Sequence, residues 1–400
     1  MKTVLITSNA YFPNIGGIEN SLRYLARSYS KKGYKVYVVV SDINNVTTTK
    51  LPKHQKIDNI EIFRYPTEHN LNRFMQPFAG IFTLYALYKQ LRYIQLQFAP
   101  DFTISRFHTT TWMARLAKLN RVVYLLPGVV KFQNHPSQMS KQTGFAKVVQ
   151  YLRYYYHVWL QRRAFKAAQT LAVFSENMQE QVLSCFCPKN ELLLTKPGVD
   201  SARFAPPSTS KKQELKHKFE IAKEKTTLLC IGRFVSAKGF KYVLEAMRNL
   251  DNYHLLLVGG GEEEEVYRDF VDQYNLTHKV TFTGVIQDPI SCYQAADIFI
   301  MSSIYEPLGQ TILEALSSGL PVVAFSRSGS VTTATEELLS HHEAIFVDKV
   351  DSIALAKSIE ALCDEHQKLI NLRMISREIA KQRFSWDALA ETLEQNALCK

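Results

Sequence analysis

Short runs of β-branched and other apolar residues alternate with longer amphipathic segments along the whole chain, and no other feature constrains the fold as strongly. This alternation is typical of parallel sheets whose strands are connected by helices. Because the runs form two series, we predict an α/β protein with two doubly wound domains. The predicted strands are Thr3–Ser8, Lys35–Ser41, Ile60–Arg64, Phe102–Arg106, Val122–Leu126, Thr170–Phe174 and Glu191–Thr195 in the first series, and Thr227–Ile231, His254–Val258, Val280–Thr283, Ile298–Met301, Val322–Phe325 and Ala344–Val347 in the second.

A stretch rich in turn residues separates the two series. It contains Pro197–Asp200 and Pro206–Pro207, and such Pro and Gly clusters mark loops and linkers. We therefore predict a first domain over residues 1–198 and a second over 199–385. Ser385 is a suitable cap for a last helix that begins at Trp386.

Composition excludes several classes of protein. With 46% hydrophobic and 21% charged residues among 400, the chain is globular and neither disordered nor collagen-like. Its six cysteines include no C-x-x-C pair, which predicts neither a zinc site nor a disulfide framework and favours the reducing cytoplasm. The apolar run at the start is too short for a signal peptide, and the longest apolar stretch, Phe74–Tyr88, is too short to span a bilayer.

Two predicted strand-to-helix turns carry residues suited to a phosphate. Gly16 and Gly17 follow the first strand, and backbone N–H groups in such a turn can approach an anion. In the second domain, Arg233 and Lys238 flank a turn where two cations can neutralise a departing diphosphate without a metal. Taken alone, each feature is about equally compatible with a structural turn or a pair of surface cations. Neither is the G-x-G-x-x-G of a dinucleotide site, so an oxidoreductase is disfavoured.

The strongest signal is a pair of carboxylates with seven residues between them. Glu306 is predicted to lie in a loop after the fourth strand of the second series, and Glu314 two turns into the following helix. Gly309, Gln310 and Thr311 would present N–H groups at the start of this helix. That arrangement favours a phosphate or a sugar hydroxyl.

In their order and spacing, these segments resemble the motifs of the retaining family 4 glycosyltransferases of GT-B fold. The matching segments are Gly16–Glu19, Gly232–Gly239, Gly259–Gly261 and Glu306–Glu314. The resemblance covers essentially the whole chain and is most specific in the second domain. It implies two Rossmann-like domains that face a central cleft, with the last helix, 386–400, packing back on the first domain.

The resemblance also implies transfer of a sugar from a nucleotide-sugar donor to an acceptor hydroxyl, with retention of configuration and without a metal or another cofactor. Arg233 and Lys238 would hold the diphosphate, Glu314 the ribose, and Glu306 a hydroxyl of the transferred sugar. Arg233, Lys238 and Glu306 would then serve catalysis, because the diphosphate departs with growing negative charge. The full set of implied donor-binding residues is Gly16, Gly17, Arg233, Lys238, Gly309, Gln310, Thr311 and Glu314.

One position departs from the family pattern. Many members carry a histidine after the strand that corresponds to Val122–Leu126, whereas this chain continues with Pro127-Gly128. His108, after the preceding strand, is the alternative candidate for a catalytic or acceptor-contacting residue. A lone histidine at that place is equally compatible with a buried structural role.

Three other functions stay open at this point. A sugar-nucleotide epimerase or hydrolase of the same fold would use the same donor contacts, but with more carboxylates in the first domain than this basic half contains. A non-catalytic carbohydrate-binding protein on a degenerate scaffold is suggested by the missing histidine and disfavoured by the intact Arg233, Lys238, Glu306 and Glu314. Nucleic-acid binding lacks a recognisable motif, so no nucleic-acid partner is predicted.

Positive charge is concentrated in one window of the first domain. Between Leu71 and Thr170 there are fourteen Lys and Arg residues and one acid, Asp101, which gives this window a charge of +13. Because the whole chain carries +11, the rest of it sums to −2. Helical patterns over Ile81–Gln97 and Tyr151–Lys166 mix aromatic residues with these cations, as in helices that lie on anionic membranes, although many of the aromatic residues are equally compatible with a core. We predict peripheral attachment to the inner face of the cell membrane and a glycan or lipid-linked acceptor, as in the synthesis of bacterial surface polysaccharide or lipopolysaccharide.

Overall fold

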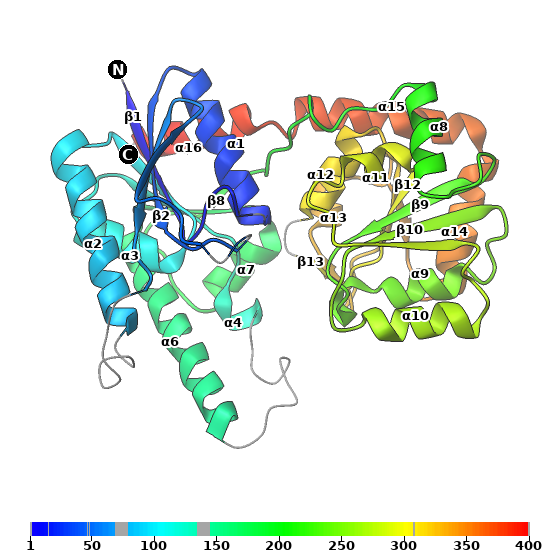
Figure 1. The fold of residues 1–400 in the computed structure, drawn as a ribbon, viewed down its shortest axis with the longest axis horizontal. Helices are drawn as coiled ribbons and strands as arrows, with labels where there is room; N and C mark the ends of the chain where they lie inside the picture. Colours follow the sequence, from blue (N-terminus) through cyan, green and yellow to red (C-terminus); the bar gives the residue numbers. More distant parts are fainter. Residues whose placement is uncertain are drawn as a thin grey trace. The chain divides into compact units, whose positions relative to one another are not determined.

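The computed structural model describes residues 2–14, 16–45, 47, 49–68, 79–133, 145–306 and 309–398. The chain divides into two compact units (Figure 1): unit 1 consists of Met1–Lys196 and Trp386–Lys400, and unit 2 of Pro197–Ser385. The division after Lys196 lies next to the boundary predicted after residue 198. Each unit contains a largely parallel sheet covered by helices, so the predicted α/β architecture of two Rossmann-like domains is confirmed.

In the described part of unit 1, eight strands form one sheet in the order β3-β4-β2-β1-β5-β6-β7-β8. Their bounds are β1 (Thr3–Thr7), β2 (Lys35–Ser41), β3 (His54–Ile57), β4 (Ile60–Tyr65), β5 (Phe102–Ser105), β6 (Val122–Leu125), β7 (Thr170–Val173) and β8 (Leu193–Leu194). All neighbours are parallel except β3 and β4. The sequence did not predict β3, because this partly exposed edge strand lacks an alternating apolar pattern.

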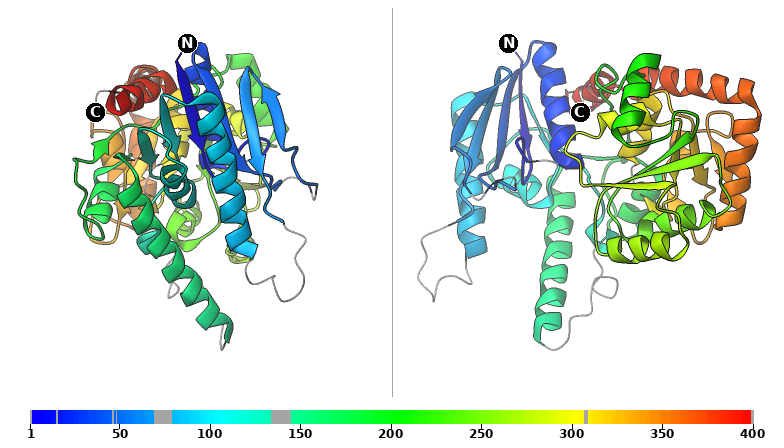
Figure 2. Two further views of the ribbon diagram at one scale, coloured as in Figure 1. Left: turned by 90° about the vertical axis from the view of Figure 1, so that its left-hand side faces the viewer. Right: turned by 45° about the vertical axis from the view of Figure 1, so that its right-hand side comes forward.

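Helices cover both faces of this sheet. Their bounds are α1 (Gly17–Lys31), α2 (Ala79–Phe98), α3 (His108–Leu116), α4 (Val130–Gln133), α6 (Phe145–Ala167), α7 (Glu176–Leu183) and α16 (Trp386–Leu398). The last helix packs on α1, where the Tyr29 hydroxyl donates a hydrogen bond to the Ala390 carbonyl at 2.7 Å and the Tyr24 ring stacks on Trp386. Figure 2 shows that α6 extends well past the sheet of unit 1.

The main sheet of unit 2 is parallel throughout and has the strand order β11-β10-β9-β12-β14-β16. Successive residues of β9 point to opposite faces: Leu228 and Cys230 enter one apolar core, and Leu229 enters the other. Burial on both faces explains why these strands are continuous apolar runs. The bounds are β9 (Thr226–Ile231), β10 (Tyr253–Val258), β11 (Val280–Gly284), β12 (Ile298–Met301), β14 (Val322–Phe325) and β16 (Ile345–Val347).

The helices of unit 2 include a short 3₁₀ turn, η2 (Ser236–Lys238). The others are α8 (Thr209–Lys218), α9 (Phe240–Ala246), α10 (Glu264–Gln273), α11 (Ile290–Ala295), α12 (Gln310–Ser317), α13 (Thr335–Leu338), α14 (Ser352–Asp364) and α15 (His366–Gln382). Two short strands, β13 (Tyr305–Glu306) and β15 (Thr332–Thr333), form a separate small sheet. Among the described residues of both units, no helix combines the length and apolar character needed to cross a bilayer.

Candidate functional site

The candidate site is built on the carboxyl ends of β9 and β12. These strands are parallel neighbours at the centre of the unit 2 sheet, and the chain continues from β9 to β10 on one side and from β12 to β14 on the other. Such a reversal of strand order opens a crevice at the carboxyl ends of the strands. The loops after β9 and β12 therefore start at the place where open α/β sheets bind their ligands.

Glycine allows the loops after β9 and β10 to pack backbone against backbone. Gly259 has φ 140°, and a Cβ there would lie 1.9 Å from the Gly232 carbonyl oxygen. Gly261 has φ 157°, and its Cβ would lie 2.6 Å from the Phe234 carbonyl oxygen. Any other residue at these positions would separate the two loops. The triple glycine thus shapes the loop that carries Arg233.

Lys238 lies at the end of η2, where its backbone is fixed to the loop after β12. Its carbonyl oxygen accepts a hydrogen bond from the Ser302 hydroxyl at 2.8 Å. Gly239, with φ 62°, allows this approach, because a Cβ there would be 2.1 Å from the Ser302 carbonyl oxygen. The Lys238 ammonium group forms an ion pair with Glu306. The tertiary fold thus brings together a cation and a carboxylate from two separately predicted motifs.

Arg233 supplies a second cation at the same edge of the sheet. Its side chain is exposed and has no hydrogen-bond or ion-pair partner among the residues that the structure describes. Its neighbour Gly232 lies against the Lys238 stem, because a Cβ there would be 3.2 Å from Lys238 Cε. An exposed guanidinium and a half-buried ammonium in the same segment after β9 would suit a diphosphate.

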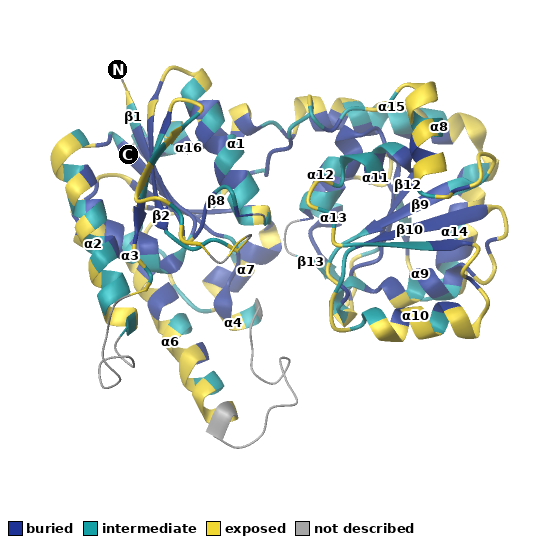
Figure 3. Cartoon of the chain, in the orientation of Figure 1, coloured by how far each residue is buried: buried dark blue, intermediate teal, exposed yellow. Residues whose placement is uncertain are grey.

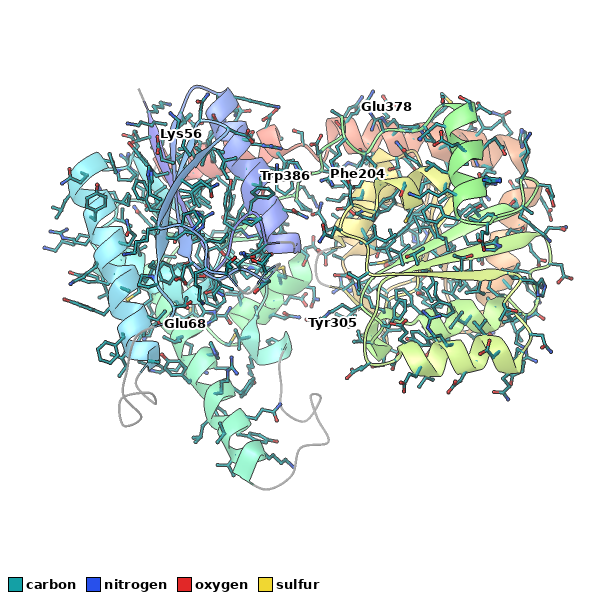
Figure 4. The ribbon with its side chains drawn as sticks, in the orientation of Figure 1. Lys56, Glu68, Phe204, Tyr305, Glu378 and Trp386 are labelled. Atoms are coloured by element: carbon teal, nitrogen blue, oxygen red, sulfur yellow. The ribbon has the colours of Figure 1, made fainter. Side chains whose placement is uncertain are left out.

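Glu306 does not lie in a loop, so that prediction was wrong. It belongs to β13, in which Glu306 pairs with Thr333, and its carbonyl oxygen accepts a hydrogen bond from the Ala334 N–H at 2.9 Å. Tyr305, the other residue of β13, is labelled in Figure 4. Pairing with β15 holds the Glu306 backbone more firmly than a loop would. The following motif residues, 307 and 308, lie outside the described residues.

Gly309 is the N-cap residue before α12 and has a left-handed conformation, with φ 70°. Gln310 and Thr311 form the first turn of the helix, where backbone N–H groups have no intrahelical acceptor and can bind an anion. The Gln310 side chain already donates a hydrogen bond to the Gly198 carbonyl oxygen at 3.2 Å. Its side-chain amide therefore connects α12 to the start of unit 2. The predicted contact of Gln310 with a phosphate would be made by its backbone N–H.

Glu314 lies in the second turn of α12, as predicted, and the structure adds a partner that the sequence did not reveal. The Tyr293 hydroxyl donates a hydrogen bond to Glu314 Oε2 at 2.7 Å. Burial raises the pKa of Glu314 to about 7, while the Tyr293 hydrogen bond and the Arg203 charge act against this rise. A carboxyl group with this pKa changes its charge near neutral pH.

Gly16, Gly17 and His108 lie in unit 1. Gly16 precedes α1 in extended backbone, and a Cβ there would be 2.3 Å from Glu19 Oε2, whereas a Cβ on Gly17 would meet no atom within 4 Å. The close Glu19 side chain thus explains why residue 16 is a glycine. Of the two glycines, Gly17 has the free space beside its backbone that a phosphate would need. That role stays a prediction for both glycines.

His108 begins α3 and is buried, with 5% of its surface exposed. Its Nε2 lies 3.0 Å from Nδ1 of His157 on α6, and this partner was not predicted. Burial, and to a smaller extent the charge of His157, lowers the pKa of His108 to about 3. The imidazole is therefore neutral at pH 7. The hydrogen bond to His157 favours the structural role for His108, which the sequence left open.

The described residues contain no cluster of three or more His, Cys, Asp or Glu side chains that could hold a metal ion. At the candidate site, Lys238 is paired with Glu306, and Arg233 lies five positions before Lys238 in the same segment after β9. The cations can donate hydrogen bonds to a phosphate, and the carboxylate can accept one from a sugar hydroxyl.

Two family models match the chain, one over each half. Glycosyltransferase Family 4 matches residues 15–203, and Glycosyl transferases group 1 matches residues 211–383. The uncharacterized glycosyltransferase MJ1607 of Methanocaldococcus jannaschii is 22% identical over 98% of this chain and 96% of its own length. The lipopolysaccharide core biosynthesis glycosyltransferase LpsD of Rhizobium meliloti is 32% identical, over 40% of this chain and 46% of its own length.

A similar fold occurs among solved structures. Anabaena Alr3699/HepE in complex with UDP-glucose superposes with a TM-score of 0.74 at 17% identity, over 100% of each chain. At this identity the likeness shows the fold alone. The roles of the site residues stay predictions.

Proposed function

Since this chain belongs to the GT-B glycosyltransferases of the group 1 and family 4 type, we propose that it transfers a sugar from a nucleotide-sugar donor to a glycan or lipid-linked acceptor with retention of configuration. The proposed setting is the synthesis of a bacterial surface polysaccharide or lipopolysaccharide. The match to a lipopolysaccharide core glycosyltransferase and the likeness to a fold solved with UDP-glucose support this proposal.

The observation that carries the proposal is the contact between Lys238 and Glu306 at the carboxyl ends of β9 and β12, with Arg233 in the same segment after β9 as Lys238. Transfer breaks the bond between the sugar and the diphosphate, forms a bond from the sugar to the acceptor oxygen and releases the acceptor proton. The diphosphate gains negative charge as it departs, and the cations stabilise it most at that moment. Glu306 would accept a hydrogen bond from a sugar hydroxyl, and Glu314 from the ribose.

Donor hydrolysis across a panel of nucleotide sugars, followed by mass spectrometry, tests the proposal. We expect one or a few donors to be hydrolysed slowly without acceptor, because water can occupy the acceptor position. The protein with Lys238→Ala and Arg233→Ala together is the matched control and should show almost no hydrolysis. If no donor is hydrolysed or bound, or if the double variant is equally active, the proposal fails.

We also propose that transfer needs no metal ion. The support is the pair of cations, because Arg233 and Lys238 supply the positive charge that a divalent cation would otherwise bring to a diphosphate. Activity measured with an excess of EDTA should equal the activity measured without it. Loss of activity with EDTA, followed by recovery on adding Mg²⁺ or Mn²⁺, would contradict metal-free transfer.

The pKa of Glu314 predicts how donor binding depends on pH. If the ionised carboxylate holds the ribose hydroxyls, the donor KM should fall as the pH rises through about 7, by roughly ten-fold between pH 6 and pH 8. Glu314→Gln cannot ionise and should give a higher KM that does not vary over this range. Steady-state kinetics across this pH range measure both values. A wild-type KM that is constant with pH would contradict the proposed contact.

Peripheral membrane attachment is the remaining part of the proposed function, and α6 supports it. Val148, Leu152, Tyr155 and Trp159 recur at helical spacing and are exposed, Leu152 by 65% and Tyr155 by 60%. Figure 3 shows the exposed residues along α6. The described cations around this stripe, all exposed, are Lys147, Arg153, Arg162, Arg163 and Lys166. An exposed apolar stripe among cations is complementary to an anionic bilayer surface.

Co-sedimentation with vesicles tests this attachment. We expect binding to phosphatidylglycerol vesicles that weakens at high salt, because the electrostatic attraction is screened within a Debye length. Leu152→Glu should reduce the bound fraction several-fold. Ile353→Glu changes a residue of α14 that is 60% exposed and should have no effect. Equal binding to neutral and anionic vesicles, or equal effects of both variants, would contradict the assignment.

A further inference from the structure

Unit 2 contains a cavity at the ends of its strands opposite to the candidate site. The cavity has a volume of about 900 Å³ and lies among α8, α11, α15 and the end of α12. Ala296 and Asp297, which precede β12, and Leu320, which precedes β14, line it. The cavity is therefore at the amino ends of these strands, whereas Arg233 and Lys238 follow the carboxyl end of β9. Its size falls in the range of small-molecule sites.

An excess of positive charge surrounds Asp297 in the lining of this cavity. The Asp297 carboxylate forms ion pairs with Lys212 Nζ at 2.6 Å, Lys216 Nζ at 3.0 Å and Arg373 Nη2 at 3.2 Å. Its side chain is only 13% exposed. Burial lowers the pKa of Lys212 despite the Asp297 charge, and the neighbouring Arg373 and Lys216 add to this lowering. One carboxylate does not neutralise three cations.

Further cations line the same cavity. Lys381 is exposed and has no hydrogen-bond or ion-pair partner in the part of the chain that the structure describes. Glu378, labelled in Figure 4, is the second acid of the lining, and it accepts a hydrogen bond from the Gln382 amide. The complete charged lining is Lys212, Lys216, Arg373, Arg377 and Lys381 against Asp297 and Glu378.

The uncharged residues of the lining favour an organic phosphate over a bare inorganic ion. Pro206, Leu320 and Met374 are apolar, so a bare inorganic ion would leave much of the cavity unfilled. A charged group attached to a carbon skeleton would meet both the cations and the apolar wall. We propose that this cavity is a binding site for a small organic phosphate, separate from the site at Lys238 and Glu306.

Titration calorimetry with ribose 5-phosphate tests the proposal, with ribose as the uncharged control ligand. The parent protein carries Arg233→Gln, which weakens phosphate binding at the other site. We expect saturable binding of ribose 5-phosphate and none of ribose. Adding Arg373→Gln and Lys381→Gln to the parent should weaken binding at least ten-fold, because two phosphate contacts are lost. Asp297 keeps its two lysine partners in this protein.

Lys223→Gln is the matched control, since Lys223 is exposed in unit 2 and lies outside the cavity. It should leave binding unchanged. Lys381→Gln alone removes a side chain that has no partner among the described residues, so it should keep the melting temperature of the parent and weaken binding several-fold. Absence of saturable binding, or equal binding by the parent and the Lys381→Gln protein, would overturn the proposal. Neither result bears on sugar transfer, which the donor panel measures.

Discussion

Replacing Lys238 with Ala is expected to slow sugar transfer by about 10² to 10³-fold, which corresponds to roughly 3 to 4 kcal/mol of lost transition-state stabilisation. The side chain is only 20% exposed, so its charge acts in a partly desolvated environment where electrostatic contacts are strong. Arg233→Ala should act in the same direction. The measurements are kcat/KM with the donor identified by the panel, and the Kd of its nucleoside diphosphate.

Lys241→Ala is the matched control, because Lys241 is exposed on α9 three positions after Lys238. Its ammonium group lies over the Tyr242 ring and has no hydrogen bond or ion pair to the described residues. Its kinetics should equal those of the wild type. Thermal unfolding separates a lost contact from a lost fold, since Lys238→Ala leaves Glu306 without its ion pair. Unchanged kinetics in both Lys238→Ala and Arg233→Ala would remove the basis for placing a diphosphate at this loop.

The second large effect is expected at Glu306. If this carboxylate holds a hydroxyl of the reacting sugar, Glu306→Gln should lower kcat by about 10²-fold and change the donor KM little. Glu314→Gln should show the converse pattern, a higher KM with a smaller change in kcat, because ribose contacts are made equally in the ground and transition states. Steady-state kinetics of the two variants at pH 8 provide the comparison.

The ion pair adds an internal check on this assignment. Because Lys238 and Glu306 are in contact, the effects of Lys238→Ala and Glu306→Gln should not add in the double variant. The effects of Lys241→Ala and Glu306→Gln should add. Identical changes in kcat and KM from Glu306→Gln and Glu314→Gln would refute the division of roles between the two carboxylates.

Local periodicity made most of the fold predictable. The buried strands β9 and β12 carry continuous apolar runs, so the predictions Thr227–Ile231 and Ile298–Met301 differ from the observed bounds by at most one residue. The edge strand β3 and the two-residue strands β13 and β15 were not predicted. Their pairing depends on a neighbouring strand that supplies the hydrogen bonds, and exposed or very short segments carry no periodic pattern.

The candidate site was predictable only as separate segments. The sequence located the loop of Arg233 and Lys238 and the helix of Glu314, because glycines, charges and the strand-to-helix order are local features. It gave no sign of the Tyr293 partner of Glu314, which comes from α11. The same holds for His157 beside His108, which comes from α6.

The sequence by itself thus determined which segments become strands and helices and which loops carry charge, since short-range sterics and apolar periodicity decide both. Only the tertiary structure decided which of these charges meet. Lys238 and Glu306 are 68 positions apart, and they form an ion pair because β9 and β12 are parallel neighbours whose carboxyl ends lie at one edge of the sheet. The three cations around Asp297 come together at the opposite edge, where α8 and α15 pack beside the start of β12. Strand order is set by the burial of whole faces, a property that no single segment of the chain contains.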